Sequence, residues 1–311
     1  MIIPLIAIIL SLLVVLRARK KHGTVAFFHP YCNAGGGGER VLWCAIRAMQ
    51  AKWPKLSYVI FSGDVDATKE QILLRAKQRF GIEIDPENVN FVFLRLRTLV
   101  EAKWYPRLTL LLQSIAGGFL ALEAVARFVP SVFIDSMGYP LSLPIFKWLA
   151  GSRVGAYVHY PTISCDMMDL VARRESSYNN CHSIAQSTIL SSAKLFYYRT
   201  FATVYGWTGR AAEVVMVNGS WTGSHISRLW KSNFEKVFPP CDIEGLLAIP
   251  VRSEQILEKE RKVHILSIGQ IRPEKNHQLQ LEVLRTVLDI VEQKEMNLEN
   301  ILGNRKIMQL L

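Results

Sequence analysis

Cysteine is scarce in this chain, and its few cysteines have no metal-binding spacing. The 311 residues include five cysteines, which lie far apart in the sequence: Cys32, Cys44, Cys165, Cys181 and Cys241. An odd number of scattered cysteines argues against a disulfide framework, and the lack of a C-x-x-C pair or a His/Cys cluster argues against a zinc site. The composition therefore predicts a protein of a reducing compartment that lacks a zinc site.

Acidic residues are also few, because 26 Asp and Glu stand against 37 Lys and Arg and leave a net charge of +11. Most of the basic residues are scattered, and no aromatic-basic nucleic-acid motif accompanies them. The one cluster is Arg17, Arg19, Lys20 and Lys21. This distribution argues against a nucleic-acid partner and favours an anionic membrane surface or a phosphorylated substrate.

A cleavable signal peptide is missing too. Ile2 to Leu16 is an apolar run, but the basic cluster follows it rather than precedes it, and no small-residue cleavage site is present. The run is somewhat shorter than the roughly 20 residues of a typical spanning helix. We interpret residues 1–21 as a single-pass N-terminal membrane anchor with a basic flank, which places the rest of the chain in the cytosol. The alternative is a buried N-terminal helix.

A run of four glycines, Gly35 to Gly38, is followed by Glu39 and Arg40 and lies between a strand-like and a helix-like segment. Glycine lets a ligand or another segment approach the main chain closely, and the amides that begin the next helix are suited to an anion. No lysine follows the run as in a Walker loop, and Arg40 occupies the place of the third glycine of a dinucleotide fingerprint. Glu39 and Arg40 either contact the ligand or cap the helix and pair on the surface.

Strand-like and helix-like segments alternate along the chain. The predicted strands are Thr24 to His29, Ser57 to Phe61, Asn90 to Leu94, Val132 to Asp135, Arg153 to Val158 and Glu213 to Val217. The predicted helices are Glu39 to Lys52, Thr68 to Phe80, Arg107 to Phe128, Leu141 to Ala150 and Ser187 to Tyr205. This alternation predicts an α/β fold with a doubly wound parallel sheet, which binds ligands beyond the carboxyl ends of its strands.

Residues 108–128 are nearly all apolar and long enough to span a membrane. Glu123 and Arg127, four residues apart on one helix face, would be costly in hydrocarbon. We therefore expect a buried or membrane-resting helix rather than a second span.

A second strand-to-helix loop follows a proline-rich break. The segment Phe238 to Asp242 opens a polar linker, predicted to cover residues 238–262, and a new strand is expected from Val263. This strand leads into Gly269, Arg272 and Lys275, with a helix from about Asn276. The predicted organisation is an anchor at 1–21, a first Rossmann-like domain at 22–237, the linker, and the start of a second domain at 263–311.

With both loops in view, the sequence resembles the retaining GT-B glycosyltransferases of family 4, whose phosphate loop reads Gly-x-x-Arg-x-x-Lys. Within them it is most similar to the dolichol-pathway α-1,2-mannosyltransferases. The stretches that carry the resemblance are His29 to Glu39, Tyr157 to Ser164, Val217 to Thr222, Phe238 to Asp242 and Ser267 to Lys275. The resemblance implies a GT-B fold with a Rossmann-like first domain and an incomplete Rossmann-like second domain.

The resemblance also implies a reaction. Family members transfer the fourth and fifth mannoses from GDP-mannose to a dolichyl-diphosphate oligosaccharide at the cytosolic face of the endoplasmic reticulum membrane. Other dolichol-pathway mannosyltransferases are possible partners, and neither a cofactor nor an essential metal is implied. The departing GDP is doubly charged, and Arg272 and Lys275 supply a planar fork and a point charge to stabilise it.

The remaining implied site residues lie at strand ends of the first domain. His159 contacts the reacting sugar or the acceptor hydroxyl as a catalytic residue, and its near-neutral pKa suits proton handling. Gly35, Gly36, Gly37, Gly38 and Glu39 line the substrate site with Asn218 and Ser220, by resemblance. Asn218, Ser220 and Thr222 are equally well explained as helix-capping residues.

Two motifs are discounted. Asp64 and Asp66 form a D-x-D pattern, but they follow a predicted strand as turn residues do. Glu274 and Glu282 have the spacing of the family's E-x7-E donor motif, but that motif belongs several strands further into the second domain.

The chain ends about one helix after the second loop, so the resemblance predicts a second domain too short to fold on its own. Two function classes follow. One is an α-1,2-mannosyltransferase, and the other is a catalytically silent membrane protein that binds the acceptor lipid or a partner enzyme.

Overall fold

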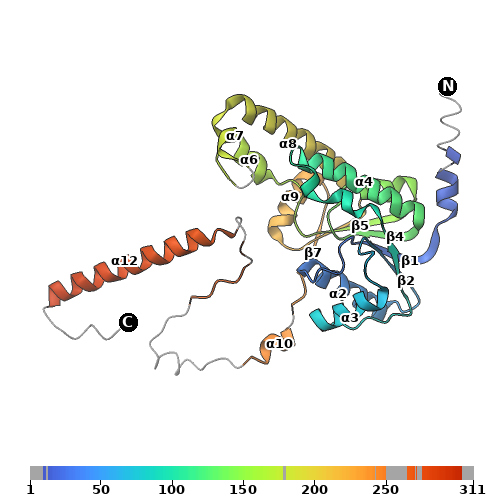
Figure 1. Cartoon of the computed structure of the whole chain (residues 1–311), viewed down its shortest axis with the longest axis horizontal. Coiled ribbons are helices and arrows are strands. Elements are labelled where there is room, and N and C mark those ends of the chain that lie inside the picture. Colours follow the sequence, from blue (N-terminus) through green and yellow to red (C-terminus); the bar gives the residue numbers. More distant parts are fainter. Residues whose placement is uncertain are drawn as a thin grey trace. The chain divides into compact units, whose positions relative to one another are not determined.

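The computed structural model describes residues 10–11, 13–177, 180–241, 243–249, 265–269, 271 and 275–302. Two compact units divide the chain, one formed by 1–175 with 182–241 and the other by 176–181 with 242–311. The first unit holds the sheet and the second holds the long C-terminal helix (Figure 1).

The first unit is built on one parallel sheet of seven strands in the order β3-β2-β1-β4-β5-β6-β7. The strands are β1 Lys21–Phe28, β2 Ser57–Ser62, β3 Val89–Phe93, β4 Pro130–Asp135, β5 Arg153–Val158, β6 Val214–Val217 and β7 Glu235–Lys236. β1 lies between β2 and β4, with Thr24 opposite Ser57 and Val25 opposite Val132. The predicted doubly wound parallel sheet is confirmed, and each predicted strand forms within a few residues of its expected bounds. The strand that the sequence did not predict is β7.

Helices cover both faces of this sheet. They are α2 Gly37–Lys52, α3 Lys69–Phe80, α4 Thr109–Arg127, α5 Ser142–Pro144, a π-helix Ile145–Leu149, α6 Cys165–Ala172, α7 His182–Gln186, α8 Thr188–Gly209 and α9 Ser220–Trp230, with 3₁₀ turns at Leu96–Val100 and Ala102–Trp104. In Figure 1, α2 and α3 lie on one side of the strands and α4 and α8 on the other. The five predicted helices form, although 141–150 divides into α5 and the π-helix, and α6, α7 and α9 were not predicted.

Alternate strand residues supply two separate cores, because successive side chains of a strand point to opposite faces. Phe28 and Phe61 lie in the core beneath α4 and α8. Phe27 and Ile60 lie in the core beneath α2 and α3. Burial on both faces explains why these strands read as continuous apolar runs rather than as alternating ones.

Helix α4 rests on the sheet through its small residues. Ala116, Ala121 and Ala124 are buried in the core. Within the described part of the chain, α4 is the one helix long and apolar enough to cross a membrane. Its Glu123 carboxylate accepts hydrogen bonds from the backbone N–H groups of Arg95 and Leu96 and pairs with Arg127. The charges that argued against a span thus fix the helix to its neighbours, and the expected burial of one face is confirmed.

About half of the predicted N-terminal anchor, residues 1–9 and 12, lies outside the described residues. The chain is helical at 10–11 and at 13–18. Leu16 belongs to the core of the first unit, whereas Leu10, Val14 and Val15 are exposed.

The second unit contains α10, Ile243–Leu247, and α12, His277–Leu302. The helix expected from about Asn276 is confirmed by α12. The strand expected from Val263 does not form at 265–269, which have no regular secondary structure. A strand needs a neighbour to satisfy its backbone groups, and none of the described residues of this unit provides one. Most of the predicted linker, 238–262, lies outside the described residues.

Close packing of α8 on α9 gives a test of the fold. A Cβ added at Gly206 would lie 2.3 Å from the backbone oxygen of Leu229. Gly206→Ala gains about 1 kcal/mol of helix propensity, but overpacking against a backbone atom costs up to about 3 kcal/mol. We expect a net loss of about 2 kcal/mol in the free energy of unfolding, measured by urea titration. Gly219→Ala, where no atom lies within 4 Å of the added Cβ, is the control, and equal stability of the two variants would contradict the packing.

Candidate functional site

The strand order places the candidate site at one edge of the sheet. The order reverses between β1 and β4, so the chain leaves these neighbouring strands in opposite directions and opens a crevice at their carboxyl ends. The glycine run follows β1, His159 follows β5 and Asn218 follows β6. The sheet therefore brings these three predicted features to the same edge.

The glycine loop is held by its own carboxylate. Glu39 is only 5% exposed. Its Oε1 accepts hydrogen bonds from the backbone N–H groups of Ala34 at 2.9 Å, Gly35 at 2.8 Å and Gly36 at 3.3 Å. Three loop amides are thus occupied before any ligand arrives, and the anion they face is Glu39. The capping alternative for Glu39 matches this geometry, and a substrate contact by its carboxylate remains a prediction.

The four glycines of the loop differ in their surroundings. Gly35 has a φ of +83°, a left-handed conformation that favours glycine. A Cβ at Gly36 or Gly37 would meet no atom within 4 Å, whereas a Cβ at Gly38 would lie 3.5 Å from His159 Nε2. The amides of Gly37 and Gly38 are in the first turn of α2 and have no intrahelical acceptor. These two amides and the His159 ring therefore form the part of the loop that is suited to a ligand.

Two histidines meet beneath this turn. His29 directly follows β1 and is buried, and its Nδ1 lies 2.8 Å from Ser136 Oγ at the end of β4. Burial, and then the nearby His159, lower the pKa of His29 to about 3. Burial also lowers the pKa of His159, against a hydrogen bond to the Ser136 backbone that raises it. Both imidazoles are therefore neutral at pH 7.

The hydrogen bonding of His159 leaves one ring nitrogen for chemistry. Its Nε2 is shielded from water and has no hydrogen-bond partner among the described residues. Because a neutral imidazole that donates one N–H to the Ser136 carbonyl has an unprotonated second nitrogen, Nε2 is an acceptor. A buried acceptor without a donor is costly unless a ligand supplies one. The geometry thus suits a hydroxyl group that donates to His159 Nε2.

Asp135 also lies at this edge, and its sequence position predicted only that it ends a strand. Its Oδ1 accepts hydrogen bonds from the backbone N–H groups of Met137 and Gly138, at 3.0 and 3.2 Å. Burial raises its pKa to about 6, against the hydrogen bonds from the backbone. The position of an acid at a strand end was visible in the sequence, but its burial depends on how the strands pair.

Asn218 and Ser220 make local contacts at the end of β6. Thr222 Oγ1 lies 2.7 Å from Asn218 Oδ1 and 3.4 Å from the His159 carbonyl oxygen. Ser220 Oγ accepts from Lys236 Nζ at 3.3 Å. The N-cap of α9 is Gly219, without a side-chain hydrogen bond, so these side chains tie α9 to the strand ends rather than cap it. A substrate contact at Asn218 or Ser220 remains a prediction.

The two predicted diphosphate-binding cations belong to the second unit. Arg272 lies outside the described residues. Lys275 is described, and its carbonyl accepts a hydrogen bond from Gln280 Nε2 at 3.0 Å within the same unit. Their assignment as catalytic residues remains a prediction.

The D-x-D pattern has a structural role. Asp64 forms an ion pair with Arg97, and its Oδ2 accepts from the Cys32 N–H at 2.8 Å. Among the described residues, no three His, Cys, Asp or Glu side chains are grouped so that they could hold a metal ion.

Comparison with known proteins identifies the family. The sequence model described as "ALG11 mannosyltransferase N-terminus" matches residues 22–230, which include His159 and β1 to β6. The chain belongs to this family. The resemblance to dolichol-pathway mannosyltransferases is thereby confirmed.

Curated relatives agree with the family match. The Caenorhabditis elegans "GDP-Man:Man(3)GlcNAc(2)-PP-Dol alpha-1,2-mannosyltransferase" is 60% identical over 282 residues, which cover 90% of this chain and 60% of that protein. The Homo sapiens protein of the same name is 50% identical over 274 residues, covering 87% of this chain and 54% of that protein. The chain thus spans little more than half the length of these relatives.

Similarity to solved structures is weak. The crystal structure of Os79 from O. sativa in complex with UDP and deoxynivalenol-3-glucoside matches with a TM-score of 0.38 and 12% sequence identity. The match covers 80% of this chain and 60% of the Os79 chain. A TM-score this low carries no information about the site.

The depressed pKa of His29 predicts a pH dependence of stability. Below pH 6.5 the unfolded chain binds a proton at His29, which the folded protein takes up only near pH 3. Each pH unit of decrease between these values therefore lowers the free energy of unfolding by about 1.4 kcal/mol. His29→Asn removes this contribution and keeps a polar group facing Ser136. In urea titrations at pH 7, 6 and 5, the unchanged protein should lose stability more steeply than the variant, and parallel curves would refute a neutral buried His29.

Proposed function

We propose that this chain is the acceptor-side part of an α-1,2-mannosyltransferase. The reaction is transfer of the fourth and fifth mannoses from GDP-mannose to a dolichyl-diphosphate oligosaccharide of the Man(3)GlcNAc(2) type. Family membership over residues 22–230 supports the reaction class. The observation that carries the proposal is the unpartnered, neutral Nε2 of His159, in contact range of the first turn of α2 at the strand-order reversal.

His159 acts in this proposal by accepting a hydrogen bond. Its N–H is held by the Ser136 carbonyl, so Nε2 accepts from a hydroxyl of the reacting mannose or of the acceptor and fixes its orientation. The lowered pKa keeps the ring neutral at cytosolic pH, which such an acceptor requires. Beside it, the free amides of Gly37 and Gly38 offer two donors to an oxygen of the same ligand.

The departing diphosphate needs positive charge, which the neutral rings of His29 and His159 do not supply. We assign that role to Arg272 and Lys275 of the second unit. Two cations neutralise the two charges of GDP, so an essential metal or cofactor is not part of the proposal. Their Gly-x-x-Arg-x-x-Lys pattern supports this assignment.

The location in the proposal is the endoplasmic reticulum membrane, with the sheet in the cytosol. The dolichol-linked acceptor in the relatives' names supports a membrane location. The basic residues directly after the apolar N-terminal run support the cytosolic orientation.

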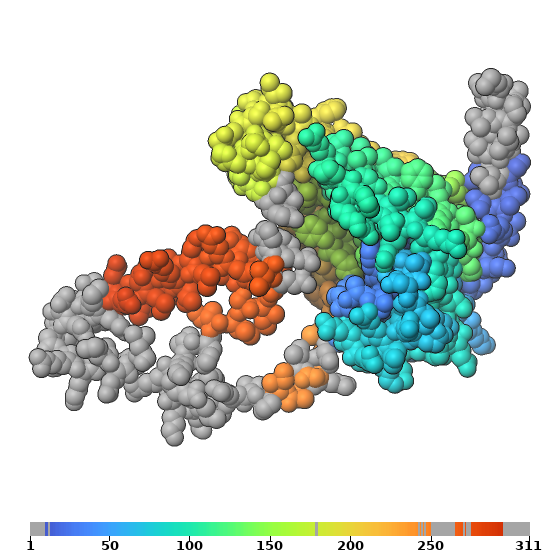
Figure 2. Space-filling view, in the orientation of Figure 1, coloured from blue at the N-terminus to red at the C-terminus, as the bar shows by residue number. Residues whose placement is uncertain are grey.

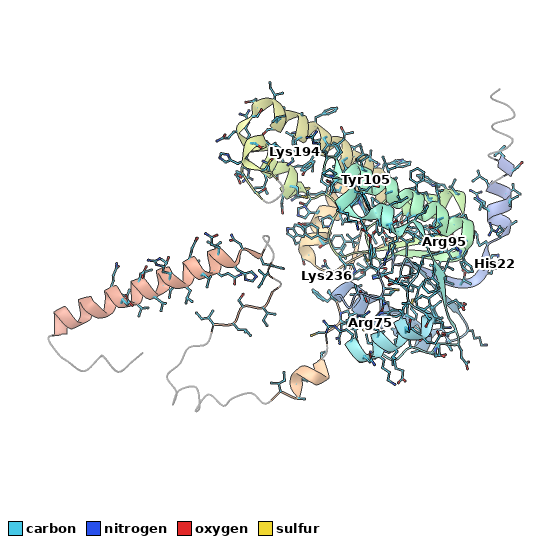
Figure 3. The ribbon with its side chains drawn as sticks, in the orientation of Figure 1. His22, Arg75, Arg95, Tyr105, Lys194 and Lys236 are labelled. Atoms are coloured by element: carbon cyan, nitrogen blue, oxygen red, sulfur yellow. The ribbon has the colours of Figure 1, made fainter. Side chains whose placement is uncertain are left out.

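The decisive experiment measures transfer of radiolabelled mannose from GDP-mannose to a Man(3)GlcNAc(2) dolichyl-diphosphate acceptor by the purified 311-residue chain. His159→Ala should lower the rate about 100-fold or more, the range for loss of a positioned proton-handling group. His22→Ala is the matched control, since His22 is exposed and lies at the amino end of β1 (Figure 3), whereas His159 follows the carboxyl end of β5.

The outcomes separate the two function classes. Transfer that depends on His159 and not on His22 supports the mannosyltransferase. Acceptor binding without any transfer would instead select the catalytically silent membrane protein. Transfer that survives His159→Ala would show that the chain is a transferase but that its catalytic residue was misassigned.

A further inference from the structure

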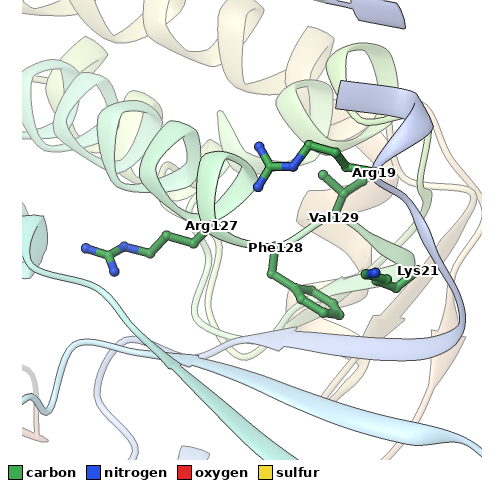
Figure 4. Close-up of a pocket in the computed structure, with 5 residues that line it drawn as sticks. All are labelled: Arg19, Lys21, Arg127, Phe128 and Val129. Carbon is green, nitrogen blue, oxygen red and sulfur yellow. The ribbon is translucent and has the colours of Figure 1, made fainter. Parts of the chain in front are cut away.

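A basic pocket lies at the edge of the sheet opposite to His159. It has a volume of about 280 Å³ and is lined by Arg19, Lys21, Arg127, Phe128 and Val129 (Figure 4). Lys21 begins β1, and Val129 directly precedes β4, so the pocket is at the amino ends of these parallel strands. The six residues of β4 separate the two edges by about 20 Å at 3.3 Å per residue. The pocket is therefore distinct from the candidate site.

The positive charge of the pocket is only partly compensated. Arg19 Nη2 donates to the Ala126 carbonyl at 2.9 Å, which is a neutral acceptor. Arg127 pairs with Glu123 at 2.9 Å, but the Glu123 carboxylate is already occupied by two backbone N–H groups. No described residue pairs with the Lys21 ammonium. The Arg127 side chain extends away from Arg19 and Lys21 (Figure 4) and pairs with Glu123, so Arg19 and Lys21 supply the uncompensated positive charge beside the cavity.

The segment that leads into the pocket is fixed to the first unit. Arg17 Nη2 donates to the Trp148 carbonyl at 2.7 Å, and Lys20 Nζ donates to the Gly151 carbonyl. Apolar side chains of the preceding helix, Val14 and Val15, are exposed at 68% and 56%. An exposed apolar helix thus ends within a few residues of the cations, the arrangement of a chain that meets a membrane interface.

A second apolar surface leads to the same pocket. The outer side of α4 carries exposed side chains at intervals of three and four residues: Leu108, Leu111, Ile115, Phe119 and Leu122. This outer stripe lies opposite the buried face of α4, and other parts of the first unit leave the green surface over α4 uncovered in Figure 2. Helix α4 ends at Arg127, in the wall of the pocket. The exposed stripe of α4 and the N-terminal helix therefore both end at this pocket.

We propose that this pocket binds the phosphate of an anionic membrane lipid headgroup, with the outer stripe of α4 lying on the same bilayer. Arg19 and Lys21 would contact the phosphate, and the Phe128 and Val129 walls suit the glycerol. The pocket volume is at the lower end of the range for ligand sites, about 300 Å³, which fits a headgroup phosphate and is too small for a nucleotide sugar. The inference is independent of the mannosyl-transfer reaction.

The test uses the full chain in an uncharged detergent and isothermal titration with three probes. The probes are dihexanoyl phosphatidic acid, dihexanoyl phosphatidylcholine and inorganic phosphate. We expect the phosphatidic acid to bind, and Lys21→Gln to weaken its binding about fivefold, because one cation near an anionic lipid is worth about 1 kcal/mol. Lys21→Arg should retain most of the affinity.

A matched control removes one charge elsewhere. Arg75→Gln alters an exposed cation on α3 (Figure 3) and should leave the affinity unchanged. Arg19→Gln, which changes the segment before β1 instead of β1 itself, is the second pocket variant and should weaken binding as Lys21→Gln does.

Three results would overturn the proposal. Equal affinity of the unchanged protein and both pocket variants would show that the lipid does not bind in this pocket. Equal affinity for phosphatidic acid and phosphatidylcholine would show that the acyl chains alone are bound. Equal affinity for inorganic phosphate and phosphatidic acid would assign the pocket to free phosphate instead of lipid.

Discussion

The carboxylate of Glu39 organises the edge of the sheet on which the candidate site depends. It accepts three backbone N–H groups from the segment that connects β1 to α2. Charge-assisted bonds of this kind are stronger than neutral ones, and they pin a loop that four glycines would otherwise leave free to move. With the loop fixed, Gly38 is held against His159 Nε2. A Cβ at Gly38 would lie 3.5 Å from His159 Nε2, an ordinary van der Waals contact, so the loop and the ring pack together at this point.

The electrostatics of this edge follow from burial. His29 and His159 are neutral because desolvation penalises the imidazolium, and the second histidine adds a smaller repulsion to the first. The same burial raises the pKa of Asp135, so an acid and a base on neighbouring strands are both driven toward their uncharged forms. Two neutral imidazoles can orient a hydroxyl, but they cannot neutralise a diphosphate. The proposed function therefore assigns that step to Arg272 and Lys275.

Local patterns predicted most of the elements of the first unit, because strands buried on both faces are apolar runs and the glycine loop separates strand from helix. The short β7 escaped prediction, since Glu235 and Lys236 are exposed and polar and pair only through their backbone. The contact between His29 and Ser136 joins residues 107 positions apart. It depends on the register between β1 and β4, which no local pattern specifies. For Glu39 the sequence left two roles open; the loop conformation matches the capping role, and a substrate contact remains a prediction.

Chain direction explains why the cations and the histidines are at opposite edges. In a parallel sheet every strand enters at one edge and leaves at the other, so a segment that precedes β1 must arrive at the amino edge. The basic cluster at 17–21 precedes β1, and the end of α4 precedes β4, its neighbour in the sheet. These two segments are therefore brought together by topology, as the hydrogen bond from Arg19 to Ala126 confirms. The strand-order reversal that opens the crevice beside His159 also makes β1 and β4 neighbours. One topological feature thus builds both the candidate site and, across the sheet, the basic pocket.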